Sequence, residues 1–277
     1  MRYAVPLEAG LEPFPGYHLR RLLGFGSFAE VWEAEAADGG RVALKFLPAE
    51  RQNATPGELR SLQAVRQLLH PNLIRIGRVW CHLGYIVIAM ELADGSLADL
   101  LASYHAERGT AVLPEHVCLL LSQAAAALDF LNGCRHRIDG QAVWIQHCDI
   151  KPSNLMLFGD TVKVADFGLA ALMPGPTMGR APGGTPAYAA PEVFRGRLSR
   201  NSDQFGLAVT YCELRTGRLP FANPPRAFLA DYFHPPPDLS ALAPKERPVV
   251  ARALAAAPEE RWASCGQFID RLARLFV

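Results

Sequence analysis

Residues 145–154 read IQHCDIKPSN, and the rest of the chain can be understood outward from this stretch. An apolar run, 142–145, enters it and predicts a short strand. Pro152 has no backbone N–H to donate, so the strand cannot continue through it and a loop must follow. The loop presents four polar side chains at fixed offsets, namely His147, Asp149, Lys151 and Asn154.

A second loop follows at Asp166-Phe167-Gly168, directly after an alternating run, 161–165, that predicts a strand. Residues 155–158 and 161–165 can pair as a hairpin through Gly159-Asp160. The hairpin would bring Asp149, Lys151, Asn154 and Asp166 together at one site. They would supply a base, a cation and two oxygen ligands for a hard metal. A proline-containing loop with solvated carboxylates is the alternative, and the order and spacing of the two motifs favour the site.

The length of 277 residues suits one large or two small lobes, and half of the residues are hydrophobic, enough for a sizeable core. A net charge of +1 argues against a nucleic-acid partner, which would need a clustered basic face. The six cysteines form no C-x-x-C pair, which favours buried thiols in a reducing compartment, hence a cytoplasmic protein. We expect no secretory leader and no membrane span, since the longest apolar run, 117–131, is short and interrupted.

Residues 1–16 are rich in proline and charge and predict an extended lead-in. A strand is expected over 17–23, followed by the glycine-rich turn Gly24-Phe25-Gly26-Ser27-Phe28 and a returning strand at Val31. Glycines in such a turn let backbone N–H groups approach phosphate oxygens without a side chain in the way. A plain glycine hairpin has the same pattern, and Ala29 stands where the third glycine of G-x-G-x-x-G would be.

Lys45 lies in an alternating strand, 42–46, among apolar neighbours, where an unpaired ammonium is costly. A partner carboxylate would come from the helix expected over 56–69, where the only acidic residue is Glu58. Alternatively, Lys45 extends to solvent along its apolar stem, and Glu58 only complements the helix dipole.

Two strands, 73–79 and 85–90, are followed by a linker at Asp94-Gly95. The C-terminal part is expected to be mainly helical, whereas 133–141 is expected to be a polar loop and 173–184 has no periodic pattern. The expected helices cover 97–106, 115–132, 202–214 and 265–276.

Three further landmarks follow in order: G-T-P-A-Y-A-A-P-E at 184–192, S-D-Q-F-G-L at 202–207, and Arg261. With the earlier motifs, they make the chain resemble the protein serine/threonine kinase family from Gly24 to Arg261. The likeness is greatest to the eukaryotic-like (Hanks-type) kinases of bacteria. It implies an α+β, bilobal fold in one kinase domain. Residues 17–93 would form a small antiparallel β-sheet N-lobe with one main helix, and residues 94–277 a larger, mainly helical C-lobe.

The resemblance also implies roles for individual residues. Asp149 would accept the proton of the acceptor hydroxyl, Lys151 would steady the γ-phosphate, and Lys45 would bridge the phosphates and Glu58. Asn154 and Asp166 would hold Mg²⁺, with Mn²⁺ as a substitute. ATP would contact Gly24, Phe25, Gly26, Ser27, Phe28, Val31, Ala43, Lys45, Met90, Glu91, Ala93, Asn154, Met156 and Asp166.

Among these residues, Met90 would be the gatekeeper beside the adenine, whose edge would meet the backbone of Glu91 and Ala93. Beyond the nucleotide site, the resemblance implies a buried ion pair between Glu192 and Arg261. It also implies that Asp203 anchors the catalytic loop. Without the resemblance, each of these charged residues reads as a surface or helix-cap group.

Lys151 and Thr185 stand where serine/threonine enzymes differ from tyrosine enzymes, so we expect serine or threonine hydroxyls of a protein substrate to be phosphorylated. Cys148 stands where many family members have an arginine that grips a phosphorylated loop residue. We therefore expect activity not to depend on phosphorylation of 166–192, where the hydroxyl groups besides Tyr188 are Thr177 and Thr185. A separate regulatory partner is possible.

Two other functions fit part of the pattern. Small-molecule phosphotransferases of the aminoglycoside or choline type share the catalytic Asp, the downstream Asn and the metal Asp, but lack the 184–192 segment. A nucleotide-binding pseudokinase that acts as a scaffold would be expected to have lost Lys45, Asp149 or Asp166, and this chain keeps all three.

Overall fold

The computed structural model describes residues 6–25, 29–48, 66–82, 84–134, 136–138, 140–173, 181, 183–229 and 231–277. The chain divides into two compact units, residues 1–69 with 74–94 and residues 70–73 with 95–277. We describe each unit by itself. The helix expected over 56–69 lies almost entirely outside the described residues.

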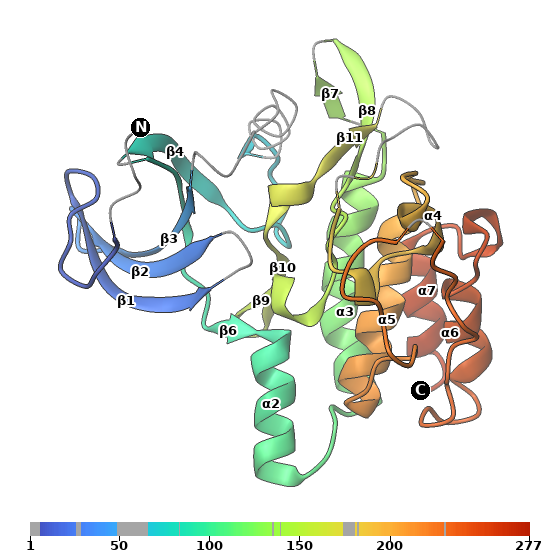
Figure 1. Cartoon of the computed structure of the whole chain (residues 1–277). Helices are drawn as coiled ribbons and strands as arrows, with labels where there is room; N and C mark the ends of the chain where they lie inside the picture. The colour runs from blue at the N-terminus through green and yellow to red at the C-terminus, as the bar shows by residue number, and fades with distance from the viewer. Residues whose placement is uncertain are drawn as a thin grey trace. The chain divides into compact units, whose positions relative to one another are not determined.

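The first unit contains a five-stranded antiparallel sheet with the order β1-β2-β3-β5-β4 (Figure 1). Its strands are β1 (Tyr17–Phe25), β2 (Glu30–Ala36), β3 (Arg41–Pro48), β4 (Ile76–His82) and β5 (Tyr85–Glu91). Strand β4 begins later than expected, because Leu73 is buried in the second unit and forms a bridge with Val164.

Alternation along these strands gives the sheet two different faces. One face holds a buried cluster that includes Trp32, Leu44, Phe46 and Val87. The pairs Val31↔Lys45 and Ala43↔Met90 lie in adjacent rows of the other face. The sheet therefore gathers Val31, Ala43, Lys45 and Met90 on the side opposite the main apolar cluster.

The lead-in to β1 folds back on the sheet, in contrast to the extended segment expected. The Gly10 N–H donates to the Leu19 carbonyl at 2.8 Å, and the Leu19 N–H donates to the Leu11 carbonyl at 2.9 Å. The reason is apolar burial, because Leu7 and Leu11 pack against the cluster that contains Trp32 and Leu44.

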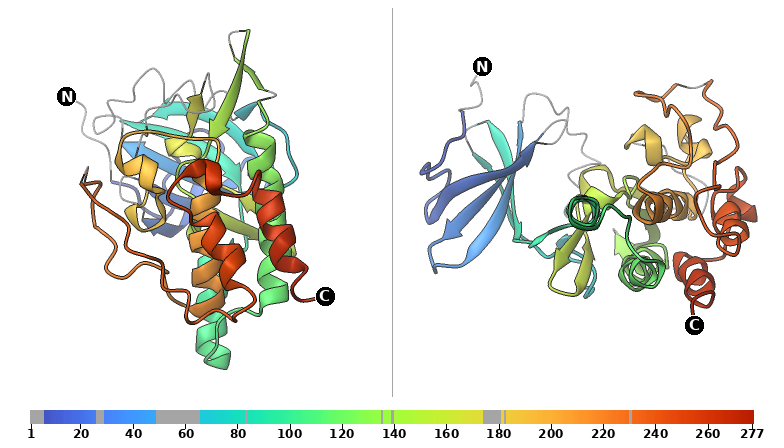
Figure 2. Two further views of the ribbon diagram at one scale, coloured as in Figure 1. Left: turned by 90° about the vertical axis from the view of Figure 1, so that its right-hand side faces the viewer. Right: turned by 90° about the horizontal axis from the view of Figure 1, so that it is seen from below.

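The second unit is built around α3 (Pro114–Leu131), which contacts α5 (Ser202–Thr216), α7 (Cys265–Ala273) and strand β10 (Thr161–Val164). Figure 2 shows the three helices side by side. Buried leucines and alanines along α3 form the centre of this core. The other helices are α2 (Leu97–Arg108), α4 (Pro191–Phe194) and α6 (Arg247–Ala253). Among the described residues, no helix combines the length and hydropathy needed to cross a bilayer.

Two small antiparallel sheets complete this unit, with the orders β10-β9-β6 and β11-β8-β7. Their strands are β6 (Gly95–Ser96), β7 (His136–Ile138), β8 (Gln141–Gln146), β9 (Leu155–Phe158), β10 (Thr161–Val164) and β11 (Ala171–Met173). The polar loop expected over 133–141 is instead largely the β7–β8 hairpin, which projects from the unit in Figure 1. Strand β8 also pairs with β11, and this contact with a distant segment cannot be predicted from the polarity of residues 133–141.

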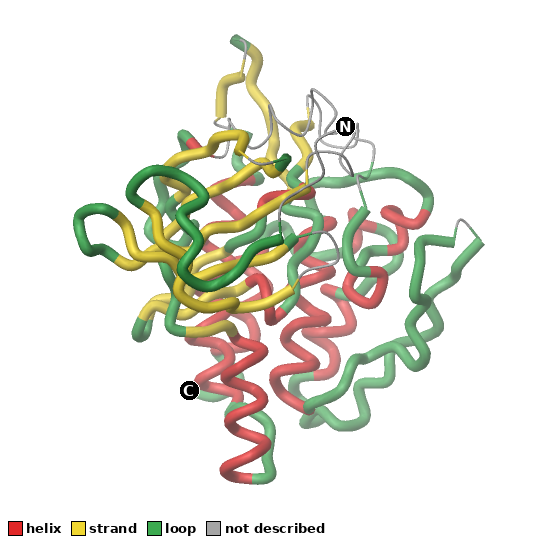
Figure 3. The backbone as a smooth tube through the Cα atoms, turned by 60° about the vertical axis from the view of Figure 1, so that its left-hand side comes forward, coloured by secondary structure: helices red, strands yellow, loops and turns green. Residues whose placement is uncertain are grey.

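A long connection joins α5 to α6. Among its described residues, 217–229 and 231–246, there is no helix or strand, and Figure 3 shows it as an extended loop along the unit. The connection is fixed at several points, for example where the Asp238 N–H donates to the Pro220 carbonyl at 2.7 Å.

Candidate functional site

The β9–β10 hairpin sets the geometry of the site. It has the predicted turn at Gly159, whose φ of 57° suits glycine, and it pairs Val164 with Leu155. Beyond the last pair, the Ala165 N–H donates to the Asn154 carbonyl at 2.9 Å. The predicted juxtaposition of the 147–154 loop and the Asp166 turn is therefore present in the structure.

Asp149 is at the centre of this loop and is 8% exposed. Its Oδ2 lies 2.8 Å from the Lys151 ammonium and accepts a hydrogen bond from Asn154 Nδ2 at 3.0 Å. Its Oδ1 accepts the Thr185 N–H at 2.8 Å. Lys151 also donates to the Thr185 hydroxyl at 2.7 Å, so one cation joins the aspartate to the later segment.

These contacts decide the charge of Asp149. Burial alone would raise the pKa of its carboxyl group. The hydrogen bond and positive charge of Lys151, aided by the Thr185 hydrogen bond, outweigh burial, so the pKa is lowered. The carboxylate is therefore ionised at neutral pH and can accept a hydrogen bond from a hydroxyl group.

Asn154 lies against this carboxylate, and Asp166 follows Ala165, whose N–H donates to the Asn154 carbonyl. Asn154 Nδ2 donates to the Asp149 carbonyl at 2.7 Å as well as to its carboxylate, and no described residue donates to Asn154 Oδ1. Asp166 begins a 3₁₀ turn and has a φ of 65°. An amide oxygen and a carboxylate are hard donors of the kind that bind Mg²⁺ together with nucleotide phosphates and water. The residues present thus fit a divalent cation.

A network of backbone hydrogen bonds fixes the start of the loop. The Asp203 carboxylate accepts the N–H groups of His147 at 2.8 Å and Cys148 at 2.9 Å. His147 is fully buried and pairs its Nε2 with the Ala165 carbonyl at 2.8 Å. Asp203 follows the first residue of α5 and does not cap it, so its carboxylate is directed to the loop, as the resemblance implied.

Cys148 and Asp166 both have positive φ values, 69° and 65°. Only four non-glycine residues have positive φ in the described part of the chain, and two of them flank this site. Such conformations persist where the surroundings hold them, and they are common at functional sites. Burial raises the pKa of the Cys148 thiol well above its usual value, so the thiol is neutral.

Gly184 explains how the later segment approaches Asp149. Its φ is 137°, and a Cβ at this position would lie 2.6 Å from the Cys148 carbonyl oxygen. Only glycine permits this approach, which places the Thr185 N–H on Asp149. The sequence shows two adjacent glycines here, but nothing in it indicates that their neighbour would be the Cys148 backbone.

The predicted ion pair between Glu192 and Arg261 is present and buried. Two guanidinium nitrogens of Arg261 each lie 2.8 Å from a carboxylate oxygen of Glu192. The hydroxyls of Ser199 and Ser202 donate to the same carboxylate at 3.1 and 2.9 Å. Burial alone would raise the pKa of Glu192, but Arg261 outweighs it and the pKa is lowered. The pair ties α4 to the segment that precedes α7.

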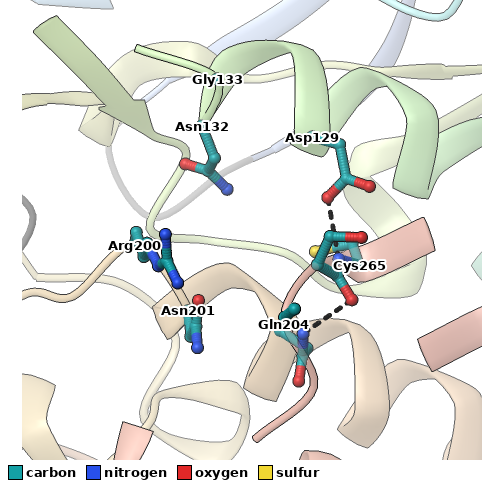
Figure 4. Close-up of a pocket in the computed structure, with 9 residues that line it drawn as sticks. Asp129, Asn132, Gly133, Arg200, Asn201, Gln204 and Cys265 are labelled. Carbon is teal, nitrogen blue, oxygen red and sulfur yellow. Dashed lines mark hydrogen bonds between the residues drawn. The ribbon is translucent and has the colours of Figure 1, made fainter. Parts of the chain in front are cut away.

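A cavity of about 210 Å³, shown in Figure 4, lies between α3, α5 and the segment that leads into α7. Gln146 donates hydrogen bonds to two of its lining residues, Asn132 and Arg200. Asp129 in its wall accepts the N–H groups of Cys265 and Gly266 at 2.8 and 2.9 Å. Gln204 donates to the Ser264 carbonyl at 2.9 Å. Because these polar groups bond to one another, the cavity wall mainly joins α3, α5 and α7.

The remaining predicted nucleotide residues lie in the first unit, except Met156, which is in β9 of the second. Gly24 and Phe25 end β1 and pair with Val31 and Glu30, so the glycine-rich turn joins two antiparallel strands, as expected. Glu91 ends β5, where its N–H donates to the Arg75 carbonyl at 3.3 Å, and Ala93 follows the strand. Gly26, Ser27, Phe28 and Glu58 lie outside the described residues.

Comparison with known proteins agrees with this arrangement. Residues 17–254 match the family model described as the protein kinase domain. CBL-interacting protein kinase 4 of Oryza sativa subsp. japonica is 38% identical over 226 residues, 76% of this chain and 46% of the relative. Serine/threonine-protein kinase PknJ of Mycobacterium tuberculosis is 32% identical over 284 residues, 95% of this chain and 45% of the relative. The chain thus spans about half the length of these relatives.

Among solved structures, the kinase domain of Mycobacterium tuberculosis PknI, determined as a cysteine-to-alanine mutant, is similar with a TM-score of 0.75 and 26% identity. The similarity covers 99% of this chain and 100% of the other. The predicted α+β kinase fold is confirmed, as is the resemblance to Hanks-type serine/threonine kinases. This chain belongs to the protein kinase domain family.

Proposed function

We propose that this chain is an ATP-dependent protein serine/threonine kinase. The observation that carries the proposal is the environment of Asp149, whose carboxylate is kept ionised by Lys151 and lies against Asn154 and the Thr185 backbone. Protein kinases use an aspartate in this position to orient the acceptor hydroxyl and accept its proton. The 32% identity to a serine/threonine-protein kinase supports the same acceptor class.

Asp149 accepts a hydrogen bond from the serine or threonine hydroxyl and directs its oxygen at the phosphorus. Lys151, already 2.8 Å from Asp149 Oδ2, can neutralise charge on the transferred group without a large movement. Thr185 fixes the position of Lys151 through its hydroxyl. The segment from Gly184 to Tyr188 gives an extended protein substrate a surface beside the aspartate, which favours a protein over a small molecule.

Protein kinases use ATP and divalent metal ions, and ATP with its metal supplies an activated phosphoryl group whose charge is partly neutralised. In this chain Asn154 and Asp166 would hold the metal, for which Mg²⁺ is the proposed ion and Mn²⁺ a substitute. Lys45 would contact the phosphates and pair with Glu58. Gly24, Phe25, Val31, Ala43 and Met90, with the backbone of Glu91 and Ala93, would surround the nucleotide.

We place the N-lobe at residues 17–93 and the C-lobe at 94–277, after a lead-in of 1–16. The compact units, which divide at Asp94, support this boundary. All six cysteines are free thiols, which supports a reducing compartment and a cytoplasmic location. The protein substrates and any regulatory partner would be separate molecules that bind this domain.

Transfer of label from radiolabelled ATP with Mg²⁺ to dephosphorylated casein tests the proposal, with Asp149→Asn as the inactive variant. Asp160→Asn is the matched control, because Asp160 is an exposed aspartate in the β9–β10 turn. We expect phosphoserine or phosphothreonine with wild type and control and almost none with Asp149→Asn. Equal transfer by wild type and Asp149→Asn would overturn the mechanism.

Thermal stability measured with and without ATP and Mg²⁺ separates the remaining functions. Stabilisation by the nucleotide without label transfer to any protein would indicate a binding scaffold. Label transfer to aminoglycosides or choline, with none to protein, would indicate a small-molecule phosphotransferase.

A further inference from the structure

The long connection between α5 and α6 exposes large apolar side chains. Phe233 is 75% exposed and Leu229 is 57% exposed. The Arg195 guanidinium, at the end of α4, lies over the Phe233 ring at 5.6 Å from its centroid. Exposed aromatic side chains next to arginine are typical of interaction surfaces, where both residue types are enriched.

These exposed side chains are held by an aromatic frame that includes the buried rings of Phe194 and Phe221. The Phe194 ring contacts the rings of Phe228 at 4.9 Å, Tyr232 at 4.8 Å and His234 at 5.2 Å. The His234 ring in turn contacts the Phe221 ring at 4.9 Å. Phe233 lies between two anchored residues, so its exposure is imposed by the surrounding packing.

The same frame is tied to the segment that contacts Asp149. Phe194, which contacts most of this frame, lies in α4, and α4 begins three residues after the Pro186–Tyr188 turn that follows Thr185. On the other side, the Ala181 N–H donates to the Gly196 carbonyl at 3.3 Å. The surface around Arg195 and Phe233 is therefore attached to the segment that contacts Asp149 through Thr185.

Positive charge predominates on this surface. Arg195, Arg197 and Arg226 are exposed, and within the described ranges no carboxylate pairs with their guanidinium groups. By contrast, Arg215 and Arg261 are paired with Glu246 and Glu192. Between residues 226 and 234 the sequence has one acidic residue, the exposed Asp231. A partner that complements this surface would be acidic.

We propose that Arg195, Arg197, Leu229 and Phe233 form a docking surface for protein substrates that carry acidic side chains next to an apolar one, close to the phosphorylated serine or threonine. The apolar side chain would pack against Phe233 and Leu229, while carboxylates would pair with the two arginines. This proposal rests on the proposed kinase function and adds the substrate class to it.

The test uses three synthetic peptides of equal length with one central serine. The flanking residues on both sides combine leucine with aspartate, asparagine or lysine. We expect the wild-type chain to phosphorylate the acidic peptide with a kcat/KM about tenfold above the neutral peptide, mainly through KM, and the basic peptide least. Fluorescence anisotropy of the labelled acidic peptide reports binding independently of phosphoryl transfer.

Three single variants, Arg195→Glu, Arg197→Glu and Phe233→Ser, change the surface. Arg274→Glu, at an exposed position after α7, and Leu119→Ser, at an exposed position on α3, are the matched controls. We expect each surface variant to lower the acidic-to-neutral ratio of kcat/KM several-fold, and the controls to preserve it. Circular dichroism confirms that each variant is folded.

The outcomes separate the two proposals. Equal kcat/KM values for acidic and neutral peptides, or an unchanged ratio in all three surface variants, would overturn the docking surface and leave the kinase function intact. If neither casein nor any of the three peptides is phosphorylated, the kinase proposal fails and anisotropy alone decides docking. A dimer that Phe233→Ser dissociates, with peptide preference unchanged, would show that this surface binds a second copy of the chain.

Discussion

Asp149 and Asp203 are buried aspartates of the same unit whose carboxylates have different partners. Asp149 has the Lys151 ammonium 2.8 Å away, and its pKa is lowered. Asp203 accepts two backbone N–H groups, and burial raises its pKa despite these bonds and the nearby His147. A full positive charge offsets burial, whereas neutral donors do so only in part.

The difference separates a chemical role from a structural one. The Asp149 carboxylate is ionised and 8% exposed, and the Lys151 ammonium lies beside it, which fits the proposed chemical role. The Asp203 carboxylate is 3% exposed and holds two peptide groups of the catalytic loop. The sequence alone does not distinguish these two roles, because each residue is simply an aspartate within a family motif.

The largest expected effect is on catalysis. Asp149→Asn should lower kcat by about 10³-fold, because an amide cannot accept the hydroxyl proton. The free energy of unfolding should fall less than in Asp203→Asn. Steady-state kinetics with a serine peptide and urea titration of both variants measure the two effects. An Asp203→Asn variant with normal stability and kcat lowered as much as in Asp149→Asn would remove the distinction between the two aspartates.

The buried pair of Glu192 and Arg261 provides a third case, a carboxylate with a cation in a structural position. Arg261→Met should lower the free energy of unfolding by about 3–5 kcal/mol, because Glu192 would remain buried without its cation. The control is Glu35→Gln, which breaks the pair of Arg20 and Glu35, whose side chains are 58% and 41% exposed. Its expected cost is below about 1 kcal/mol.

A double variant sharpens this result. Glu192→Gln combined with Arg261→Met should cost less than the sum of the single variants, since the second change removes a charge that the first has stranded. Additive costs from chemical denaturation would show that the two charges act independently.

Asp203→Asn tests the structural aspartate. One of the two carboxylate oxygens that accept these N–H groups becomes an amide NH2 group that faces a donor. We therefore expect a loss of about 2 kcal/mol in the free energy of unfolding. Hydrogen exchange should show faster exchange of the His147 and Cys148 amides than in wild type. Unchanged protection of both amides would contradict the anchoring role.

Acid pH should affect the two aspartate variants in opposite directions. A lowered folded pKa, as for Asp149, gives stability that is present above the unfolded pKa of about 3.9 and lost as the pH falls through the folded value. The stability deficit of Asp149→Asn relative to wild type should therefore shrink below about pH 4.

The raised folded pKa of Asp203 has the reverse consequence. Protons bind more tightly to the folded state, so wild type gains stability over Asp203→Asn as the pH falls from the folded value towards the unfolded value of about 3.9. The deficit of this variant should grow on acidification. Urea titrations between neutral pH and the acid limit of folding measure both slopes, and slopes of equal sign would contradict the contrast.

The smallest effect is expected from removal of phosphate. Cys148 presents a partly buried thiol that its raised pKa keeps neutral, and it cannot bind a phosphorylated residue as an arginine would. Phosphatase treatment of the recombinant protein should therefore change kcat by less than about twofold. A twofold change in kcat corresponds to only a few tenths of a kcal/mol in the activation free energy. Loss of activity that returns on phosphorylation of Thr177 or Thr185 would contradict this expectation.

The local sequence pattern predicted the parts of the site that are formed by residues close together in the chain. The β9–β10 hairpin followed from the Gly159-Asp160 turn between two alternating runs. The backbone of Asn154 therefore lies beside Ala165, which precedes Asp166, as predicted. Strand β8 was predicted from the apolar run 142–145, but its hairpin with β7 was not, because residues 133–141 are largely polar. The pairing of β8 with β11 joins distant segments and was not predicted either.

Long-range contacts account for the other differences. The close approach of Gly184 to Cys148, and the bonds from Thr185 to Asp149 and Lys151, link segments separated by the whole Asp166 turn. The roles of Asp203 and of Arg261 with Glu192 came only from the family resemblance, since neither residue has a local pattern that reveals its partner. Propensity and periodicity describe local structure and carry no such information.

The turn at Asp166 is bracketed by backbone pairing on both sides. Before it, Val164 pairs with Leu155, and after it Ala171 pairs with Gln146, so both flanks are attached to the strands that border the catalytic loop. The Phe167 ring also lies edge-on to the His147 ring, 4.9 Å between centroids. An inhibitor that displaced the Phe167 side chain would first have to break the pairing of strand Ala171–Met173 with β8. Compounds that accept the turn as it stands should therefore bind this protein more tightly than compounds that displace it.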